Sequence, residues 1–121
     1  SFAIPINLAR DIAEQLARAG VYRRALLGIN HLEIDAAMAR QFDLPTTEGV
    51  IVVGIGAGTP AAAGGMRRGD IIVRMDDAEI ENAGDLRRFM RARRPGDVVN
   101  VEVVRPQGRV QLRIRLGEGV G

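Results

Sequence analysis

The clearest pattern of apolar and polar residues lies near the end of the chain. In residues 98–105 and 109–116, aliphatic residues alternate with other residues, most of them polar. A period of two predicts strands with one buried and one exposed face. The buried faces would consist of Val99, Val101 and Val103 and of Val110, Leu112, Ile114 and Leu116. The Pro-Gln-Gly sequence at 106–108 predicts a short hairpin loop between the two strands.

Apolar runs predict three more strands earlier in the chain. They cover residues 26–34 (LLGINHLEI), 49–55 (GVIVVGI) and 70–76 (DIIVRMD). The run at 49–55 is apolar on both faces, so we expect it to be buried. The first run contains Gly28, and a glycine inside a strand marks a bulge or a close approach to the backbone.

Helical periodicity predicts two main helices, over residues 7–20 and 82–96. The first carries an apolar stripe of Leu8, Ile12 and Leu16. The second begins at Asn82, which can cap it together with an acidic residue three positions later, and ends at Pro95-Gly96. A shorter helix is expected over residues 35–42, and Thr59-Pro60 predicts one further helical turn. These elements indicate an α+β, mainly β, domain whose partly closed sheet is capped by helices.

Composition supports a single domain. The chain has 121 residues, of which 46% are hydrophobic and 26% charged, and aromatic residues make up only 3%, so aliphatic side chains must fill the core. No apolar run approaches the roughly 20 residues of a membrane helix, and the first residues do not resemble a signal peptide. The chain starts at Ser1 without an initiator Met, so we expect a fragment of a longer protein.

The inventory of reactive side chains argues against catalysis within this chain. There is no Cys, the only Ser is Ser1 and the only His is His31. A Ser-His-Asp device needs a Ser on a rigid element beside the His, and a zinc site needs more His or Cys ligands. We therefore expect no hydrolase site, no metal site and no cofactor. Asp76 and Asp77, at a strand end, are interpreted as turn formers rather than as an acid–base pair.

All 17 basic residues are Arg, but the net charge is only +2. Five of them gather on the second helix: Arg87, Arg88, Arg91, Arg93 and Arg94. Without an aromatic stacking platform, nucleic-acid binding is not expected. The arginines are interpreted as a solvated face with a secondary role in attracting acidic peptides. The glycines at 54, 56 and 58 fit neither the dinucleotide fingerprint nor the Walker motif.

Gly28 suggests a binding function. A loop ending at Gly28 can hold an anion on converging backbone N–H groups, and the strand that follows can accept an extended peptide as an added strand. A peptide C-terminus supplies both the anion and the extended backbone. A glycine would let the terminal carboxylate approach without meeting a Cβ. A bulky replacement at Gly28 should then abolish binding with little loss of fold. The alternative is a buried strand with a bulge.

Alternation places Leu27, Ile29 and His31 on one face, where they would line a groove. The helix at 82–94 would form its far side, with Phe89 as the largest apolar contribution. Leu86 and Met90, four residues apart, would anchor that helix to the core. His31 would contact a ligand residue upstream of the terminus, or have no role.

Three segments, in order along the chain, resemble the PDZ region of HtrA-type serine proteases. Residues 1–29 resemble the junction formed by the last protease strand, a connecting helix and the carboxylate-binding loop. Residues 49–77 resemble the family's strand, Pro-Ala-rich turn, Gly-Asp and strand, and residues 82–116 match its helix, Pro-Gly turn and final hairpin. Two departures are Ile29, where an aromatic residue is common, and Asp76-Asp77-Ala78, where Asn-Gly is common.

This resemblance implies a PDZ-like, partly closed antiparallel sheet or barrel of five to six strands capped by two helices. The strand order would be the permuted bacterial one, with the binding strand first and the closing strand last. It divides the chain into a protease tail and connecting helix (1–20), a PDZ domain (21–118) and a tail (119–121). The implied carboxylate-binding loop consists of Leu26, Leu27, Gly28 and Ile29. The expected peptide groove consists of Asn30, His31, Leu86, Phe89 and Met90.

The function implied is that of a peptide-binding module. It would capture C-terminal or unfolded polypeptide segments by strand addition, and regulate or feed an attached serine endoprotease whose catalytic His, Asp and Ser are missing from this chain. The resemblance implies a periplasmic or otherwise extracytoplasmic location and leaves membrane anchoring open. The alternative is a structural or assembly domain whose groove is filled by its own or a neighbouring chain. The helix at 7–19 can pack on the domain, on the protease or on another copy, which would give self-association.

Overall fold

The structure is a computed structural model that describes residues 23–120. Eight strands and three helices follow one another within this range. The strands are β1 (Arg23–Leu26), β2 (Ile29–Glu33), β3 (Val50–Ile55), β4 (Ile71–Met75), β5 (Ala78–Glu79), β6 (Val98–Arg105), β7 (Gly108–Arg115) and β8 (Gly117–Val120). The helices are α2 (Ala36–Gln41), α3 (Pro60–Ala63) and α4 (Ala83–Arg91).

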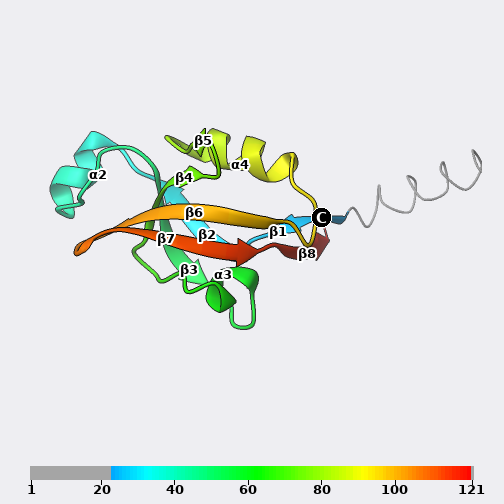
Figure 1. The fold of residues 1–121 in the computed structure, drawn as a ribbon. Coiled ribbons are helices and arrows are strands. Elements are labelled where there is room, and N and C mark those ends of the chain that lie inside the picture. Colours follow the sequence, from blue (N-terminus) through cyan, green and yellow to red (C-terminus); the bar gives the residue numbers. More distant parts are fainter. Residues whose placement is uncertain (1–22, 121) are drawn as a thin grey trace, which may run out of the picture.

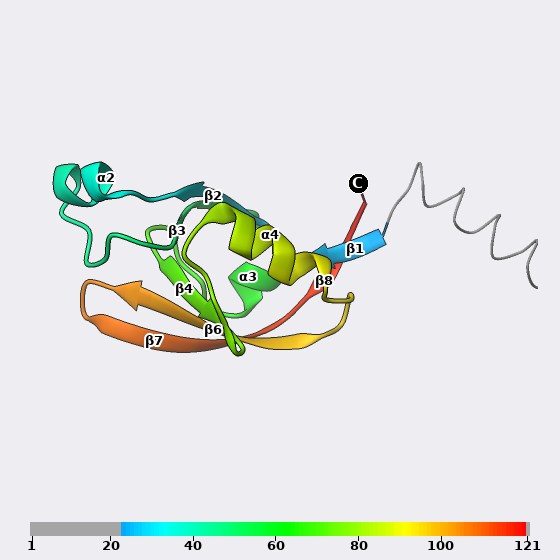
Figure 2. The same cartoon turned by 90° about the horizontal axis from the view of Figure 1, so that it is seen from above.

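Two antiparallel sheets carry the fold. The larger has the strand order β2-β3-β4-β6-β7, with β5 paired to β4, and the smaller consists of β1 and β8. Figures 1 and 2 show α4 and α3 on different sides of the curved large sheet, with the β1–β8 pair continuing it at one end. The predicted fold class, mainly β with antiparallel sheets, is confirmed. The sheets do not close into a barrel.

The terminal hairpin forms as its alternation predicts. β6 and β7 pair along their whole length, from Val98 opposite Arg115 to Arg105 opposite Gly108. The buried side chains of this hairpin include Val99, Val101, Val103 and Ile114. They join a core that also takes residues from β3, β4 and α4, among them Val52, Ile72, Met75, Leu86 and Phe89. Aliphatic residues fill most of this core, as the low aromatic content requires.

Side-chain caps fix where the helices start. Asp35 accepts a hydrogen bond from the Met38 N–H at 2.7 Å at the start of α2, and Thr59 caps α3. At α4, Asn82 accepts from the Asp85 N–H at 2.8 Å, while Asp85 accepts from the Glu81 N–H at 3.0 Å. The bond to Asn82 confirms the predicted cap, and the Asp85 side chain bonds to the residue just before Asn82. α4 ends at Arg91 rather than at residue 96, because residues 92–96 form turns that lead into β6.

The strand predicted over residues 26–34 is wrong as a single element. Residues up to Leu26 belong to β1, which pairs with β8, and the chain then changes sheet at residues 27–28 before β2 pairs with β3. Residues 117–120 form β8, which extends into the segment predicted as a tail. The predicted helix at 7–20 lies outside the described residues.

A buried ion pair lies where β4 begins and β6 ends. Asp70, only 2% exposed, accepts hydrogen bonds from Arg105 Nε at 2.8 Å and from its Nη2 at 2.9 Å. Arg105 Nη2 also donates to the Gly65 carbonyl, and Asp70 accepts from the Arg67 N–H. The pair therefore ties together the turn before β4, β4 itself and β6. The Gly-Asp motif is evident in the sequence, but its partner Arg105 lies 35 positions later and has no local signal.

No helix within residues 23–120 is long and apolar enough to cross a membrane.

Candidate functional site

A groove of about 750 Å³ lies between the β1–β2 segment and α4. One wall is formed by residues 25–29 and His31, and the other by α4 and the turn that follows it. The apolar side chains of the groove include Ala25, Leu27, Ile29, Leu86 and Met90. Figure 2 shows α4 lying along β2 and reaching toward β1.

The orientation of α4 is fixed at both ends. Near its start, the Ala83 N–H donates to Glu33 Oε1 at 2.9 Å, which holds this end at the end of β2. Beyond its last turn, residues 92–95 line the groove together with residues 25–28. The helix therefore runs antiparallel to β2, with its C-terminal end at the loop between β1 and β2.

One edge of β2 is open. β2 pairs with β3, and within residues 23–120 no strand pairs with its other edge. Antiparallel ladders use alternate residues on each edge. Because the Gly28 carbonyl accepts from Gly56 on the β3 side, the backbone groups of Ile29 are directed to the opposite, open edge. An extended peptide can add there as a further strand.

The loop before β2 turns two amides away from the body of the domain. The Leu27 carbonyl accepts from the Ala61 N–H at 3.0 Å, and the Gly28 carbonyl accepts from the Gly56 N–H at 3.1 Å. In a trans peptide the N–H lies opposite the preceding C=O, and none of the described peptide bonds is cis. The N–H groups of Gly28 and Ile29 therefore point away from β3 and α3, on the side where the groove lies.

Gly28 is required for a different reason than the sequence suggests. Its φ of +87° lies in the region that favours glycine. A Cβ at this position would lie 2.4 Å from the Thr59 Cβ, on the α3 side of the loop and not in the groove. The expectation that a bulky residue here would leave the fold intact is therefore wrong.

Most of the predicted site residues meet at the groove. Seven of them line it: Leu26, Leu27, Gly28, Ile29, His31, Leu86 and Met90. Leu86 is also part of the core and only 4% exposed, so it both packs in the core and lines the groove.

Phe89 and Asn30 are placed elsewhere. Phe89 is 6% exposed, packs in the core and faces a second hollow, where the Arg93 guanidinium lies 4.3 Å from its ring centroid. It lies about 100° around the helix from Met90, which explains why the two residues face different spaces. Phe89 therefore does not line the groove, whereas Met90 both lines it and packs against the core, as expected of an anchor for this helix. The Asn30 side chain lies beside Gly54 on β3.

His31 is a neutral group beside a positive one. Burial lowers the pKa of His31, and the charge of Arg87 lowers that pKa further. Both effects favour the uncharged imidazole. Its Nδ1 is buried and has no hydrogen-bond partner within the part of the chain that the structure describes.

The groove is strongly basic, although the arginines were expected to have only a secondary role in attracting acidic peptides. Four arginines line it: Arg87, Arg91, Arg93 and Arg94. No Asp or Glu lines it within the described range. The cluster was visible in the sequence, but only the orientation of α4 shows that it faces the groove.

The second hollow, of about 720 Å³, lies on the other side of α4 and includes Asp76, Asp77, Arg93 and Asn100. Asp76 accepts from the Asn100 N–H at 2.9 Å and lies 3.8 Å from Arg93. Asp76 and Asp77 thus stand at the β4–β5 turn, in agreement with the interpretation as turn residues. Residues 23–120 contain no group of three or more metal-ligating side chains placed to hold an ion.

Comparison with known proteins agrees with this geometry. The family model described as PDZ domain matches residues 25–116. A probable periplasmic serine endoprotease, DegP-like, from Pseudomonas fulva is 36% identical over 117 residues, which cover 97% of this chain and 24% of that protein. The periplasmic pH-dependent serine endoprotease DegQ of Escherichia coli is 32% identical, over 95% of this chain and 25% of that protein. The chain thus spans about a quarter of the length of these relatives.

Solved structures give the same result. The HtrA-type protease AlgW with a decapeptide superimposes with a TM-score of 0.76 at 28% identity, over 95% of this chain and 35% of that one. The HtrA3 PDZ domain bound to a phage-derived ligand superimposes with a TM-score of 0.72 at 20% identity, over 84% of this chain and 93% of that one, which shows the fold. The open edge of β2, the loop at Gly28 and the match over residues 25–116 lead to one conclusion: the chain belongs to the PDZ domain family, and it is similar to the PDZ regions of HtrA-type proteases.

Proposed function

We propose that this domain binds polypeptide C-termini or unfolded segments by adding them as a strand along the open edge of β2. The observation that carries the proposal is the pair of amides at Gly28 and Ile29. The carbonyls before them are bonded to Ala61 of α3 and to Gly56 beside β3, so both N–H groups can donate to a terminal carboxylate. Charge-assisted hydrogen bonds of this kind contribute roughly 1.5–3 kcal/mol each.

The groove would also receive the terminal side chain. Leu27, Ile29 and Met90 provide an apolar surface beside the loop. The carboxylate-binding loop is assigned to residues 26–29, and the groove to His31, Leu86 and Met90. Asn30 lies on the other face of β2 and its backbone is paired with Gly54 of β3, so it is not assigned to the groove.

Within a longer protein, the domain would regulate or feed an attached HtrA-type serine endoprotease. The curated relatives carry such a protease and are described as periplasmic. We assign the same setting to this chain, with the domain reading substrates and the cleavage residues lying outside these 121 residues.

The test is a titration of the domain with a library of peptides varied at the last residue, each made with a free carboxylate and with a C-terminal amide. The best free-acid peptide should bind about ten- to a hundredfold more tightly than its amide, because the amide loses at least one charge-assisted bond. Fluorescence polarisation measures both affinities. Equal affinities for the two forms would contradict the proposal.

The assembly alternative is tested in the same samples. If the groove is filled by a neighbouring chain, light scattering should show a stable oligomer, and if it is filled by the domain's own chain, a monomer. In both cases no peptide should bind. A monomer that binds free-acid peptides would exclude that alternative.

A further inference from the structure

The groove has a charge pattern that a terminal carboxylate alone does not explain. Within the described residues, no ion pair is formed by Arg87, Arg91 or Arg94, and no acidic side chain lines the groove with them. The other helix arginines differ: Arg88 pairs with Asp85 at 2.9 Å, and Arg93 lies over Phe89 near Asp76. Three arginines that form no ion pair within residues 23–120 therefore line the space that a peptide would occupy.

These three arginines stand at two different places along the groove. Arg91 and Arg94 lie at the C-terminal end of α4, beside the loop of residues 25–28. The negative end of a helix dipole disfavours an anion there, and these two cations offset it for the terminal carboxylate. Arg87 lies one turn earlier, where its charge is felt by His31.

The spacing of Ile29 and His31 on β2 indicates which residues of a bound peptide would lie near each group of arginines. Ile29 and His31 both line the groove and are two residues apart. In a strand added antiparallel to β2, side chains alternate in direction. If the terminal residue lies at Ile29, the third residue from the C-terminus also faces the groove, beside His31 and Arg87. The fourth residue from the C-terminus faces away from α4.

We propose that this domain selects peptides with an aspartate or glutamate as the third residue from the C-terminus, which pairs with Arg87 and accepts a hydrogen bond from His31. The inference rests on the proposed function and names its substrate class. His31 is a neutral donor whose buried Nδ1 has no partner within residues 23–120. Its tautomer can adjust so that the exposed ring nitrogen donates to the acidic side chain. Lysine or arginine at that peptide position would be rejected by the guanidinium of Arg87.

The experiment starts from the best free-acid peptide of the terminal-residue library. Its third residue from the end is set to Asp, Asn or Arg, and a fourth peptide carries Asn there and Asp at the fourth residue from the end. The Asp peptide should bind about tenfold more tightly than the Asn peptide, the size expected for one ion pair with a charge-assisted hydrogen bond in a half-open groove. The Arg peptide should bind least, and the shifted Asp should give at most about a twofold gain.

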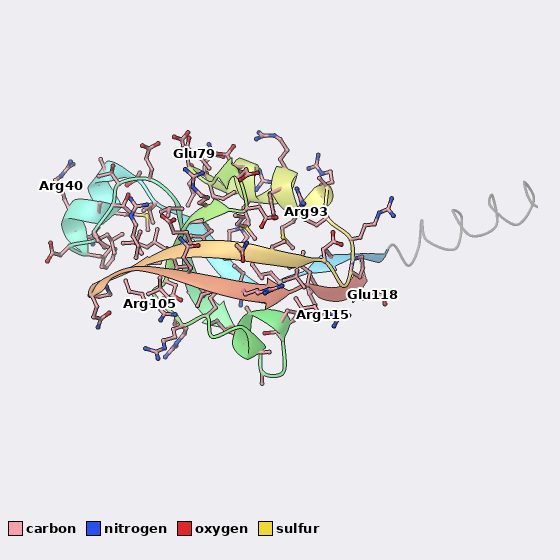
Figure 3. The ribbon with its side chains drawn as sticks, viewed as in Figure 1. Arg40, Glu79, Arg93, Arg105, Arg115 and Glu118 are labelled. Carbon is pink, nitrogen blue, oxygen red and sulfur yellow. The ribbon has the colours of Figure 1, made fainter. Side chains whose placement is uncertain are left out.

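Arg87→Gln should reduce the preference for Asp over Asn to about twofold or less. Arg40→Gln is the matched control, because it makes the same change of charge on α2, at the opposite end of the molecule from Arg93 (Figure 3). The control should keep the full preference. Both residues are exposed, so thermal melts should coincide and exclude a folding effect.

Equal binding of the Asp and Asn peptides would overturn this inference alone, since the free-acid requirement would still stand. An equal gain from the shifted Asp, or a preference that survives Arg87→Gln, would also overturn it, because either result would indicate general attraction to a basic surface. If no free-acid peptide binds, the proposed function itself fails and this inference fails with it.

Discussion

Replacing Asp70 by Asn should lower the free energy of unfolding by about 3–5 kcal/mol, the usual cost of removing one partner of a buried ion pair. Asp70 is 2% exposed, and its carboxylate accepts from Arg105 and from the Arg67 N–H. An Asn side chain has one oxygen for these donors, and its NH₂ group would face one of them. The Arg105 side chain, which is 14% exposed, would then remain largely covered without a counter-charge. Urea unfolding measures the change.

Glu102→Gln is the matched control. Glu102 also pairs with an arginine, Arg109, and accepts from Gln111 at 2.7 Å, but the Arg109 side chain is 68% exposed. A pair open to water contributes at most about 1 kcal/mol. If Asp70→Asn costs no more than Glu102→Gln, the ion pair at the start of β4 does not hold β4 and β6 together as described.

Replacing Gly28 by Ala should destabilise the domain by roughly 2–5 kcal/mol. Part of this cost, about 1–2 kcal/mol, comes from an alanine at positive φ, and overpacking contributes roughly a further 1–3 kcal/mol. The overpacking arises because the new Cβ would lie 2.4 Å from the Thr59 Cβ. Thermal or urea unfolding of the variant gives the value.

Two variants separate these causes. Gly58→Ala places alanine at φ +72° with nothing within 4 Å of the new Cβ, so it should cost only the backbone part, about 1–2 kcal/mol. Thr59→Gly removes the side chain that Gly28→Ala would strike, and the double variant should regain part of the loss. A Gly28→Ala variant no less stable than Gly58→Ala would contradict the close approach of Thr59 to this loop.

Loss of peptide binding in a Gly28 variant would therefore not identify the carboxylate site. The same substitution disturbs the loop and the start of α3, whose Thr59 caps the helix. Peptide chemistry, with the protein unchanged, is the cleaner probe of this site.

Local patterns predicted the elements that local physics decides. The alternation in residues 98–116 determined the hairpin and its buried face, and capping residues such as Asp35 and Asn82 marked the helix starts. These features depend on neighbours within a few positions. The end of α4 was placed too late, because residues 92–96 turn to reach the next strand.

Features that depend on distant partners were not predictable in this way. The run LLGINHLEI has the composition of one strand, but β8 pairs with its beginning and β3 with its remainder. Phe89 was expected in the groove because it is the largest apolar residue of the helix, and only the position of α4 on the sheet shows that it faces the second hollow. The role of Gly28 depends on Thr59, which lies 31 positions later in the sequence.

The basic lining of the groove depends on both the local sequence and the contacts between distant residues. The five arginines of residues 87–94 are evident in the sequence, and their charge suggests acidic partners. The helix orientation, fixed by the bond from Ala83 to Glu33, places three of them along the peptide path, where they form no ion pair with any residue in the range 23–120. Without the orientation of α4, the arginines would indicate only a basic surface and not a preference for an acidic residue at one peptide position.

The most direct measurement for the central claim is an NMR titration that follows the backbone amides of Gly28 and Ile29. With a free-acid peptide, both amide protons should move downfield as they donate to the carboxylate, and the amidated peptide should move them far less. Amides of the second hollow, such as those of Ala78 and Asn100, serve as the internal reference and should stay near their free positions. If the amide signals of Ala78 and Asn100 shift while those of Gly28 and Ile29 do not, the peptide C-terminus is bound elsewhere and this loop does not bind the carboxylate.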